Sequence, residues 1–227
     1  GLIGDLVTSL FVDGDGQLWI GTSAGISCYY EGKFRNYKPT NNTDGNSVTA
    51  IAANGNGDLW FGTVAGASVF DGTYFTNYTR ADGLGTGVTG IVESHDDDLW
   101  LSTLYEGIVR FDGDQFLPLA TVPTALSSVD MIRALMRDRL GGIWAATPNG
   151  LWHFAEDRWS LYTEEDGLPS SQTSAVLEDK SVQIWCGTGW HYLNDTVAGG
   201  GVARMSPGEW TNFSVGDGLL SNGVMTA

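Results

Sequence analysis

The sequence predicts an all-β protein, a β-propeller built of about five four-stranded blades, and three observations support this prediction. A Leu/Ile-Trp-x-x-Thr stretch occurs five times, with its tryptophan at positions 19, 60, 100, 144 and 185. Successive tryptophans lie 41, 40, 44 and 41 residues apart, which is the period of a propeller blade or a solenoid unit. Each period holds four short apolar stretches between Gly, Asp and Asn turns, and none has the 3.6-residue apolar period of a helix.

Every unit is expected to hold four strands in the same order. The first is apolar, as in 48–51; the second carries the tryptophan; the third follows a glycine; and the fourth opens with an aromatic residue. Residues 129–139 lie where other units have their first strand, so we expect a strand there too. The units run over 1–43, 44–82, 83–125, 126–166 and 167–217, and 218–227 copies the opening strand of a further unit. We expect 1–227 to form a single propeller array, either a fragment of a larger propeller or a minimal version of one.

The repeated tryptophans are expected to form the core rather than a binding site. A blade must cover both of its faces, and one Trp side chain buries about 150–250 Å². That area corresponds to roughly 4–6 kcal/mol of gross hydrophobic free energy, as an upper bound. Recurrence in register in every unit favours packing over sugar stacking.

Composition narrows the candidate partners and cofactors. The chain has 11 Lys and Arg against 27 Asp and Glu, a net charge of −16, so no nucleic-acid partner is expected. No apolar run reaches the about 18 residues of a membrane span, and no signal peptide opens the sequence. Cys28 and Cys186 lack the paired spacing of a metal or redox motif, and we expect buried free thiols. His95, His153 and His191 show no metal-ligand spacing, so neither a metal nor another cofactor is predicted.

Two stretches carry a resemblance to a known family. Residues 14–22 (Gly-Asp-Gly-Gln-Leu-Trp-Ile-Gly-Thr) and 71–78 (Asp-Gly-Thr-Tyr-Phe-Thr-Asn-Tyr), with the Asp-Gly-Leu motif between units, resemble the two-component regulator propeller repeat. That repeat occurs in the extracytoplasmic sensor regions of bacterial hybrid histidine kinases. The resemblance, which covers essentially the whole chain, implies a periplasmic or extracellular sensor beside a signalling domain or a dimer partner. It is specific for fold and much less so for function, because the matching residues are structural.

The fifth unit departs most from the repeat. Its distance from the tryptophan to the next Asp-Gly-Leu is 32 residues, against 22 in the second and fourth units. Rings that stack on sugar faces and polar groups that bind hydroxyls are typical of a carbohydrate or small polar ligand site. The alternative is a loop that folds over the end of its own blade. The candidate ligand-binding residues in this insertion are Trp190, His191, Tyr192, Asn194 and Asp195.

Two further sets of residues differ between the units. Tyr105 and Glu106 lie in a loop one residue longer than its counterparts, and they could face the same opening as the insertion or form a solvated turn. Arg110, His153 and Arg204 occupy the same position of the third strand in consecutive units. They could form a basic patch for a carboxylate-bearing ligand, or lie at strand ends with their charged groups in water.

Three functions remain open at this stage. The leading hypothesis is a non-enzymatic ligand-sensing or binding module, with carbohydrate as the candidate ligand. The second is a propeller-fold lyase or glycosidase acting on an acidic polysaccharide, with His191 as base and Arg110, Arg204 or Glu106 positioning the substrate. The third is a scaffold for protein interactions. Because no catalytic spacing is present, no catalytic residue is nominated, and an enzyme is the less favoured expectation.

Overall fold

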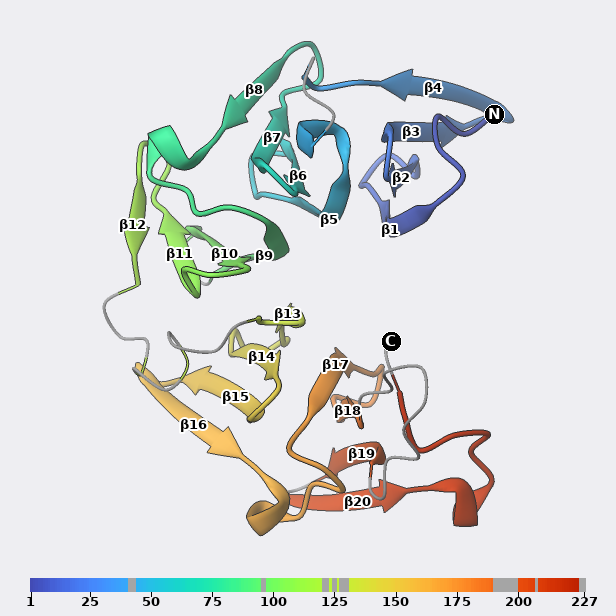
Figure 1. The fold of residues 1–227 in the computed structure, drawn as a ribbon, viewed down its shortest axis with the longest axis vertical. Helices are drawn as coiled ribbons and strands as arrows, with labels where there is room; N and C mark the ends of the chain where they lie inside the picture. The colour runs from blue at the N-terminus through green and yellow to red at the C-terminus, as the bar shows by residue number, and fades with distance from the viewer. Residues whose placement is uncertain are drawn as a thin grey trace. The chain divides into compact units, whose positions relative to one another are not determined.

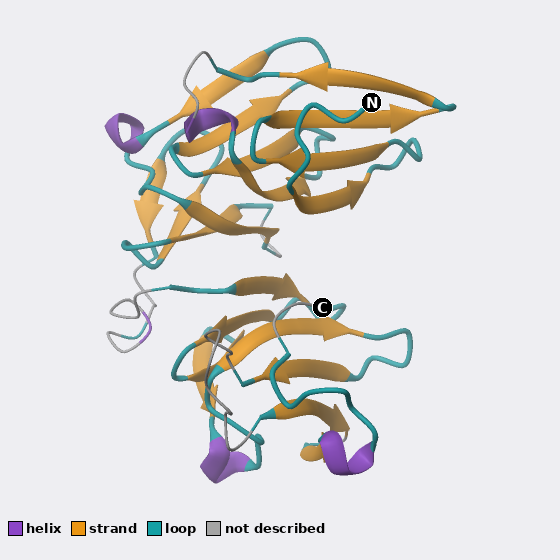
Figure 2. Cartoon of the chain, turned by 45° about the vertical axis from the view of Figure 1, so that its right-hand side comes forward, coloured by secondary structure: helices purple, strands orange, loops and turns teal. Residues whose placement is uncertain are grey.

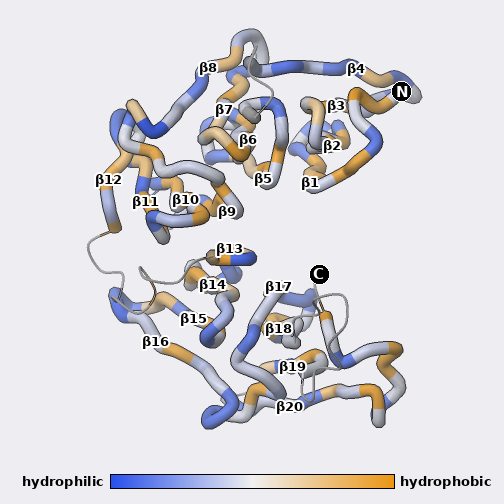
Figure 3. Tube along the Cα trace, in the orientation of Figure 1, coloured by the Kyte–Doolittle hydropathy of each residue, from blue (hydrophilic) through white to orange (hydrophobic). Residues whose placement is uncertain are grey.

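The computed structural model describes residues 1–40, 44–94, 97–119, 123, 126, 131–189, 200–206 and 208–224. Within these residues the chain forms five four-stranded antiparallel sheets, each with its strands in sequence order (Figure 1). Helical structure in the described elements is confined to short 3₁₀ turns (Figure 2). Apolar and polar stretches alternate along the chain (Figure 3). The predicted all-β class with four strands per repeat is confirmed.

The chain divides into two compact units, Gly1–Ala120 and Thr121–Ala227. The first unit contains three sheets. Their strands are β1 (Val7–Val12), β2 (Leu18–Thr22), β3 (Gly25–Tyr30) and β4 (Lys33–Tyr37); β5 (Val48–Ala53), β6 (Leu59–Thr63), β7 (Gly66–Phe70) and β8 (Phe75–Tyr78); and β9 (Val88–Glu93), β10 (Leu99–Thr103), β11 (Ile108–Phe111) and β12 (Phe116–Pro118). Two 3₁₀ turns, η1 (Asp44–Asn46) and η2 (Arg80–Asp82), precede the second and third sheets.

The second unit contains the fourth and fifth sheets. Their strands are β13 (Ala134–Arg137), β14 (Ile143–Thr147), β15 (Gly150–Ala155) and β16 (Arg158–Tyr162); and β17 (Thr173–Glu178), β18 (Ile184–Thr188), β19 (Gly201–Ser206) and β20 (Glu209–Phe213). The turns η3 (Glu164–Asp166) and η4 (Val215–Asp217) follow the two sheets. β13 lies inside the stretch 129–139, where a first strand was predicted. No described residues form a helix that is long and apolar enough to cross a membrane.

The Asp-Gly-Leu motif that follows the fourth strand of a sheet has a clear structural cause. In η2, the side chain of Thr79 caps the turn and the carboxylate of Asp82 accepts the Thr79 backbone N–H, forming a capping box. Gly83 then takes a left-handed conformation with φ of 90°, which a glycine adopts without strain. Leu84 is fully buried. The same caps recur at η3 and η4, so the motif turns the chain from one sheet into the next.

Four of the five repeat tryptophans are buried, as predicted, and Trp185 is only partly buried. Three of the rings donate their indole N–H to an aspartate in the preceding turn: Trp19 to Asp13 at 2.7 Å, Trp144 to Asp138 at 2.7 Å and Trp185 to Asp179 at 2.8 Å. The second sheet has Asn54 at this position, and the buried indole N–H of Trp60 has no hydrogen-bond partner.

Neighbouring sheets of the first unit interlock through a glycine. A β-carbon on Gly21 would lie 2.6 Å from the Val48 side chain, and one on Gly62 would lie 2.7 Å from Val88. The missing side chain therefore lets the next sheet's first strand approach closely. The last described segment lies on the fifth sheet in the same way, because a β-carbon on Gly187 would lie 2.8 Å from Val224.

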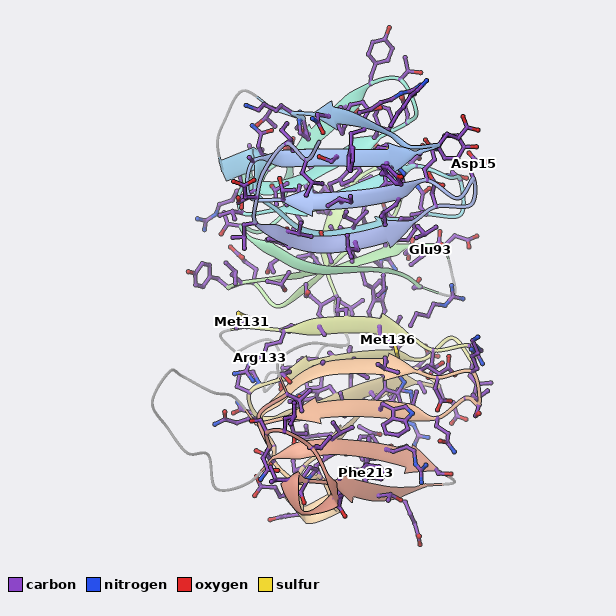
Figure 4. The ribbon with its side chains drawn as sticks, turned by 90° about the vertical axis from the view of Figure 1, so that its right-hand side faces the viewer. Asp15, Glu93, Met131, Arg133, Met136 and Phe213 are labelled. Carbon is purple, nitrogen blue, oxygen red and sulfur yellow. The ribbon has the colours of Figure 1, made fainter. Side chains whose placement is uncertain are left out.

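Hydrogen bonds also join neighbouring sheets within each unit. Thr8 donates its hydroxyl to the Val48 carbonyl at 2.6 Å, and Thr49 donates to the Val88 carbonyl. In the second unit the guanidinium of Arg133 donates to the Thr173 carbonyl at 3.0 Å (Figure 4). At the other end of the sheets, Glu93 accepts the backbone N–H of Gly55.

The last described segment, 218–224, differs from the strand expected over 218–227. It is not a strand, and 225–227 lie outside the described residues. Its Val224 nevertheless makes the contacts of a first strand, because the Ser174 hydroxyl donates to the Val224 carbonyl and the Val224 N–H donates to the Thr188 carbonyl at 3.2 Å.

Both cysteines are free and buried, which confirms that prediction. Cys28 lies beside Trp19 in the first core, and Cys186 lies in the core of the second unit. Burial raises the pKa of the Cys186 thiol to about 12. This thiol is therefore uncharged at neutral pH and packs as a small apolar group.

Replacing Gly62 with alanine tests the interlock between sheets. Because Val88 is fully buried and cannot move aside, we expect Gly62→Ala to lower the free energy of unfolding by about 1–3 kcal/mol, measured by urea denaturation. Gly14→Ala is the matched control, since no atom lies within 4 Å of its β-carbon position. Equal stability of the two variants would contradict the interlock.

The unpaired indole of Trp60 makes a second prediction about stability. Asn54→Asp combined with Asp58→Gln reproduces the pair of the first sheet, where Gln17 and Trp19 both donate to Asp13. The double variant should gain about 1 kcal/mol in a thermal or urea unfolding experiment. Asp13→Asn, the reverse change, should lose a similar amount. A double variant less stable than the wild type would contradict the stabilising role of an aspartate that accepts the indole N–H.

Candidate functional site

The hairpin between the second and third strands of each sheet is closed in the same way. A threonine that ends the second strand donates its hydroxyl to the carbonyl of the glycine before or at the start of the third strand. The O···O distances are 2.9 Å for Thr22–Gly25, 3.2 Å for Thr63–Gly66, 3.2 Å for Thr103–Gly107, 2.7 Å for Thr147–Gly150 and 3.1 Å for Thr188–Gly201. The loop between these residues differs in length, so the sheet tolerates insertions at this edge.

The fifth-sheet hairpin contains the insertion. Its ends are anchored to the linker before the sheet: Gly189 donates its N–H to the Gln172 carbonyl at 2.9 Å, and Gly200 donates to the Pro169 carbonyl at 3.3 Å. A side chain at Gly200 is excluded, because φ is 110° and a β-carbon would lie 2.6 Å from the Asn222 carbonyl. The candidate residues Trp190, His191, Tyr192, Asn194 and Asp195 lie outside the described residues.

The third-sheet hairpin presents an aromatic ring beside a carboxylate. Tyr105 is 73% exposed, and Glu106 is also exposed. The Thr103 hydroxyl oxygen, which closes the hairpin, also accepts the Glu106 N–H at 3.0 Å. The Glu106 carboxylate lies against Gly85, where a side chain would displace it. The two side chains thus stand on a hydrogen-bonded turn and are accessible to a ligand.

Arg110, His153 and Arg204 do not share one environment. Each is the cross-strand partner of the tryptophan in its own sheet. Arg110 forms an ion pair with Asp98, with 3.3 Å between Nε and Oδ2. The Arg204 guanidinium lies 5.5 Å from the Trp185 ring centroid and 5.6 Å from that of Phe213, in the range of cation–π contact.

His153 is packed rather than presented to solvent. Its ring stacks on Trp144 with 3.8 Å between centroids and 11° between planes. Its Nε2 atom lies 3.5 Å from the Asp138 carboxylate, which also accepts the Trp144 indole N–H. Burial lowers the pKa of His153, and Asp138 opposes that shift only in part. The imidazole is therefore neutral at pH 7 and serves the core. Each of the three predicted patch residues therefore has its partner within its own sheet.

The sequence did not indicate one surface that the structure reveals. A hollow of about 420 Å³ lies on the fifth sheet. It is lined by Leu177, Asp179, Trp185, Cys186, Gly187, Val202 and Val224. Most of these residues belong to the repeated core pattern, so the sequence pattern alone does not distinguish them. The described residues contain no group of three or more His, Cys, Asp or Glu side chains that could hold a metal ion.

Comparison with known proteins shows which proteins carry a similar repeat and fold. The family model described as "two component regulator propeller" matches residues 1–24. The chain is similar over its whole length to the extracellular domain of a protein described as a hybrid two component system of B. thetaiotaomicron, with 19% identity and a TM-score of 0.82. It spans 31% of that chain. A search of the curated proteins gave no match.

Two further solved structures share the fold and differ in what their names say they do. Virginiamycin B lyase from Staphylococcus aureus is 17% identical, with a TM-score of 0.72 over 97% of this chain and 74% of its own. PorZ, a surface component of the type-IX secretion system of Porphyromonas gingivalis, is 16% identical, with a TM-score of 0.66 over 96% of this chain and 35% of its own. At these identities the similarity establishes the propeller fold and not the activity.

The half-buried His153 predicts a pH dependence of stability. Its folded pKa lies below the unfolded value of 6.5, so the unfolded chain takes up the proton first as the pH falls. Stability should therefore decrease as pH drops through 6.5 toward the folded pKa. His153→Gln should remove this part of the slope, measured by urea denaturation between pH 7.5 and pH 5 (roughly the range in which histidine titrates). An unchanged slope would show that His153 does not titrate in this way.

Proposed function

We infer that this chain, which carries the two-component regulator propeller repeat, is a non-enzymatic sensing or binding module of the periplasm or the cell exterior. The observation that supports this proposal is the common closure of the hairpins between second and third strands. Thr103 and Thr188 close their hairpins by the same bond as the short ones, although their loops are longer. Added residues at this edge leave the sheets unchanged and are free to contact a ligand.

The proposed ligand is a carbohydrate or another small polar molecule. In the third-sheet hairpin, Tyr105 offers an exposed ring and Glu106 an exposed carboxylate. An aromatic face stacks on the apolar face of a sugar, while a carboxylate accepts its hydroxyl groups. In the fifth-sheet hairpin, the sequence supplies the same chemistry with Trp190, Tyr192 and Asp195. The two hairpins are independent candidates, and each can be tested alone.

The basic residues of the predicted patch are engaged within their own sheets. His153 is stacked on Trp144, Arg204 lies over its own sheet's rings, and Arg110 is paired with Asp98. A lyase or glycosidase needs a positioned acid or base with a suitable pKa, and the base named for that alternative, His191, lies outside the described residues. The enzymatic and scaffold hypotheses become alternative outcomes of the binding experiment.

A sensor must pass ligand binding on to another part of the molecule. The similarity to the extracellular domain of a hybrid two component system suggests an adjacent signalling domain or a dimer partner as the recipient. Because this chain spans 31% of that structure, the signalling step is a proposal for the assembly in which the propeller functions.

Calorimetry of the purified chain against neutral and acidic oligosaccharides tests the proposal. Tyr105→Ala combined with Glu106→Gln should weaken binding about tenfold or more if the third-sheet hairpin holds the ligand. Trp190→Ala combined with His191→Ala tests the fifth-sheet hairpin in the same way. Tyr74→Ala is the matched control, because Tyr74 is also 73% exposed but lies in the turn between third and fourth strands.

Three results would count against a binding module at these hairpins. Cleavage of an oligosaccharide by the wild-type chain would support the enzymatic alternative. Absence of binding by a chain whose folding is verified by circular dichroism would support the scaffold. Binding that both hairpin variants and the Tyr74→Ala control retain equally would move the site elsewhere on the protein.

A further inference from the structure

The third sheet differs from the other sheets in both its hairpin and its linker. The hairpin 103–107 is one residue longer than the hairpin of the second sheet, and the linker 84–88 is one residue shorter than the linker into the fifth sheet. The two segments lie against each other, because Leu104 donates its N–H to the Gly87 carbonyl at 2.9 Å. The exposed side chains of this hairpin therefore stand beside a shortened linker.

A glycine in this linker makes room for the carboxylate of Glu106. Gly85 follows the leucine of the Asp-Gly-Leu motif, at the position where two other linkers have Pro169 and Leu220. A β-carbon on Gly85 would lie 2.8 Å from the carboxylate carbon of Glu106, which is closer than two non-bonded carbon atoms approach. The carboxylate therefore occupies the space that any other residue at this position would fill.

Within the described part of the chain, no basic side chain neutralises this carboxylate. The ion pairs formed there by Lys, Arg and His side chains do not include Glu106. The first unit, Gly1–Ala120, has 5 Lys and Arg against 15 Asp and Glu, a net charge of −10 (5 − 15). An electrostatic field of this sign attracts cations and repels anions. A ligand that meets Glu106 is therefore favoured by positive charge and disfavoured by negative charge.

An exposed aromatic ring precedes the carboxylate in the same hairpin. Tyr105 is 73% exposed, and 104–106 form a bend rather than a strand. The alternation that sends successive strand residues to opposite faces therefore does not apply to Tyr105 and Glu106. An aromatic face attracts a cation, and a carboxylate accepts charge-assisted hydrogen bonds from an ammonium group. The two side chains together supply the groups that recognise an ammonium ion.

We propose that the ligand of the third-sheet hairpin carries a protonated amine, which Glu106 binds through its carboxylate and Tyr105 through its ring face. This inference rests on the proposed binding function and adds the charge class of the ligand. It excludes acidic sugars from this hairpin, because the carboxylate and the charge of the first unit both repel them. An amino sugar and a simple aliphatic amine share the required ammonium group.

Calorimetry with oligomers of glucosamine, N-acetylglucosamine and galacturonic acid tests the charge class directly. The buffer is slightly acidic and low in salt, so that the sugar amines are protonated. The glucosamine oligomer should bind at least about tenfold more tightly than the acetylated one, because acetylation removes the positive charge and leaves the sugar ring. The galacturonic acid oligomer should bind most weakly. Added salt should weaken binding of the glucosamine oligomer, since it screens the attraction.

The probe 1,4-diaminobutane distinguishes the two sources of an amine. Binding as tight as that of the glucosamine oligomer identifies the ammonium group alone as the recognised feature. Weaker binding shows that the sugar ring adds its own contact, which Tyr105→Ala should then remove. Both results support recognition of an amine at this hairpin.

Two variants separate the charge of Glu106 from its position. Glu106→Gln removes the charge, and Gly85→Ala keeps it but displaces the carboxylate, because the new β-carbon needs its space. Each variant should lower the affinity for the glucosamine oligomer to that for the acetylated oligomer, which should itself stay unchanged. Gly14→Ala is the matched control for the glycine substitution, since no atom lies within 4 Å of its β-carbon position. Circular dichroism establishes that each variant is folded.

The contradicting results distinguish this inference from the binding function on which it rests. Equal affinity for the glucosamine and acetylated oligomers, with both weakened by Tyr105→Ala, would overturn the amine and keep the binding function. A preference for glucosamine that Glu106→Gln retains would show that this carboxylate is not its cause, and would also overturn the inference. Absence of binding to every probe by a folded chain would overturn both.

Discussion

The close approach of one sheet to the next at a glycine is the constraint on which the first unit depends. Without a side chain at Gly21 or Gly62, the valine that opens the next sheet's first strand contacts the second strand directly. That approach brings the following sheet over the tryptophan of the preceding sheet. The tryptophan and the apolar residues that face it are then buried together. Hydrogen bonds such as Thr8 to the Val48 carbonyl add direction to packing that would otherwise be non-specific.

This mode of packing determines where function can be located. Within each unit, the facing sides of neighbouring sheets are in contact with one another. In the turns after the first strands, Asp13, Asp138 and Asp179 accept the indole N–H of the tryptophans. The hairpins between second and third strands are held by the bond from threonine to glycine and by backbone bonds from their ends to the preceding linker. The residues between these anchors can vary without changing the anchors, and the longest departure from the repeat lies there, after Thr188.

The repeat made most of the fold predictable. Five repeats, four strands in each and the core tryptophans follow from residue types that recur at a fixed period, and the buried free thiols from the lack of a paired cysteine spacing. The environment of the basic residues did not follow, because spacing places Arg204 and His153 in one column without showing that each group would lie on its own sheet's tryptophan. The partial exposure of Trp185 was equally inaccessible, since it depends on what packs against a sheet rather than on the sheet's own sequence.

Native-state hydrogen exchange measures the central claim most directly, namely that each sheet is stabilised by the sheet that covers it. Within the described residues of the first unit, β6 belongs to a sheet that packs on both the first and the third sheets, whereas the first sheet packs on the second alone. The account predicts that the backbone amides of β6 exchange more slowly than those of β2 under conditions of local opening. Equal protection of the two strands, or slower exchange in β2, would contradict it.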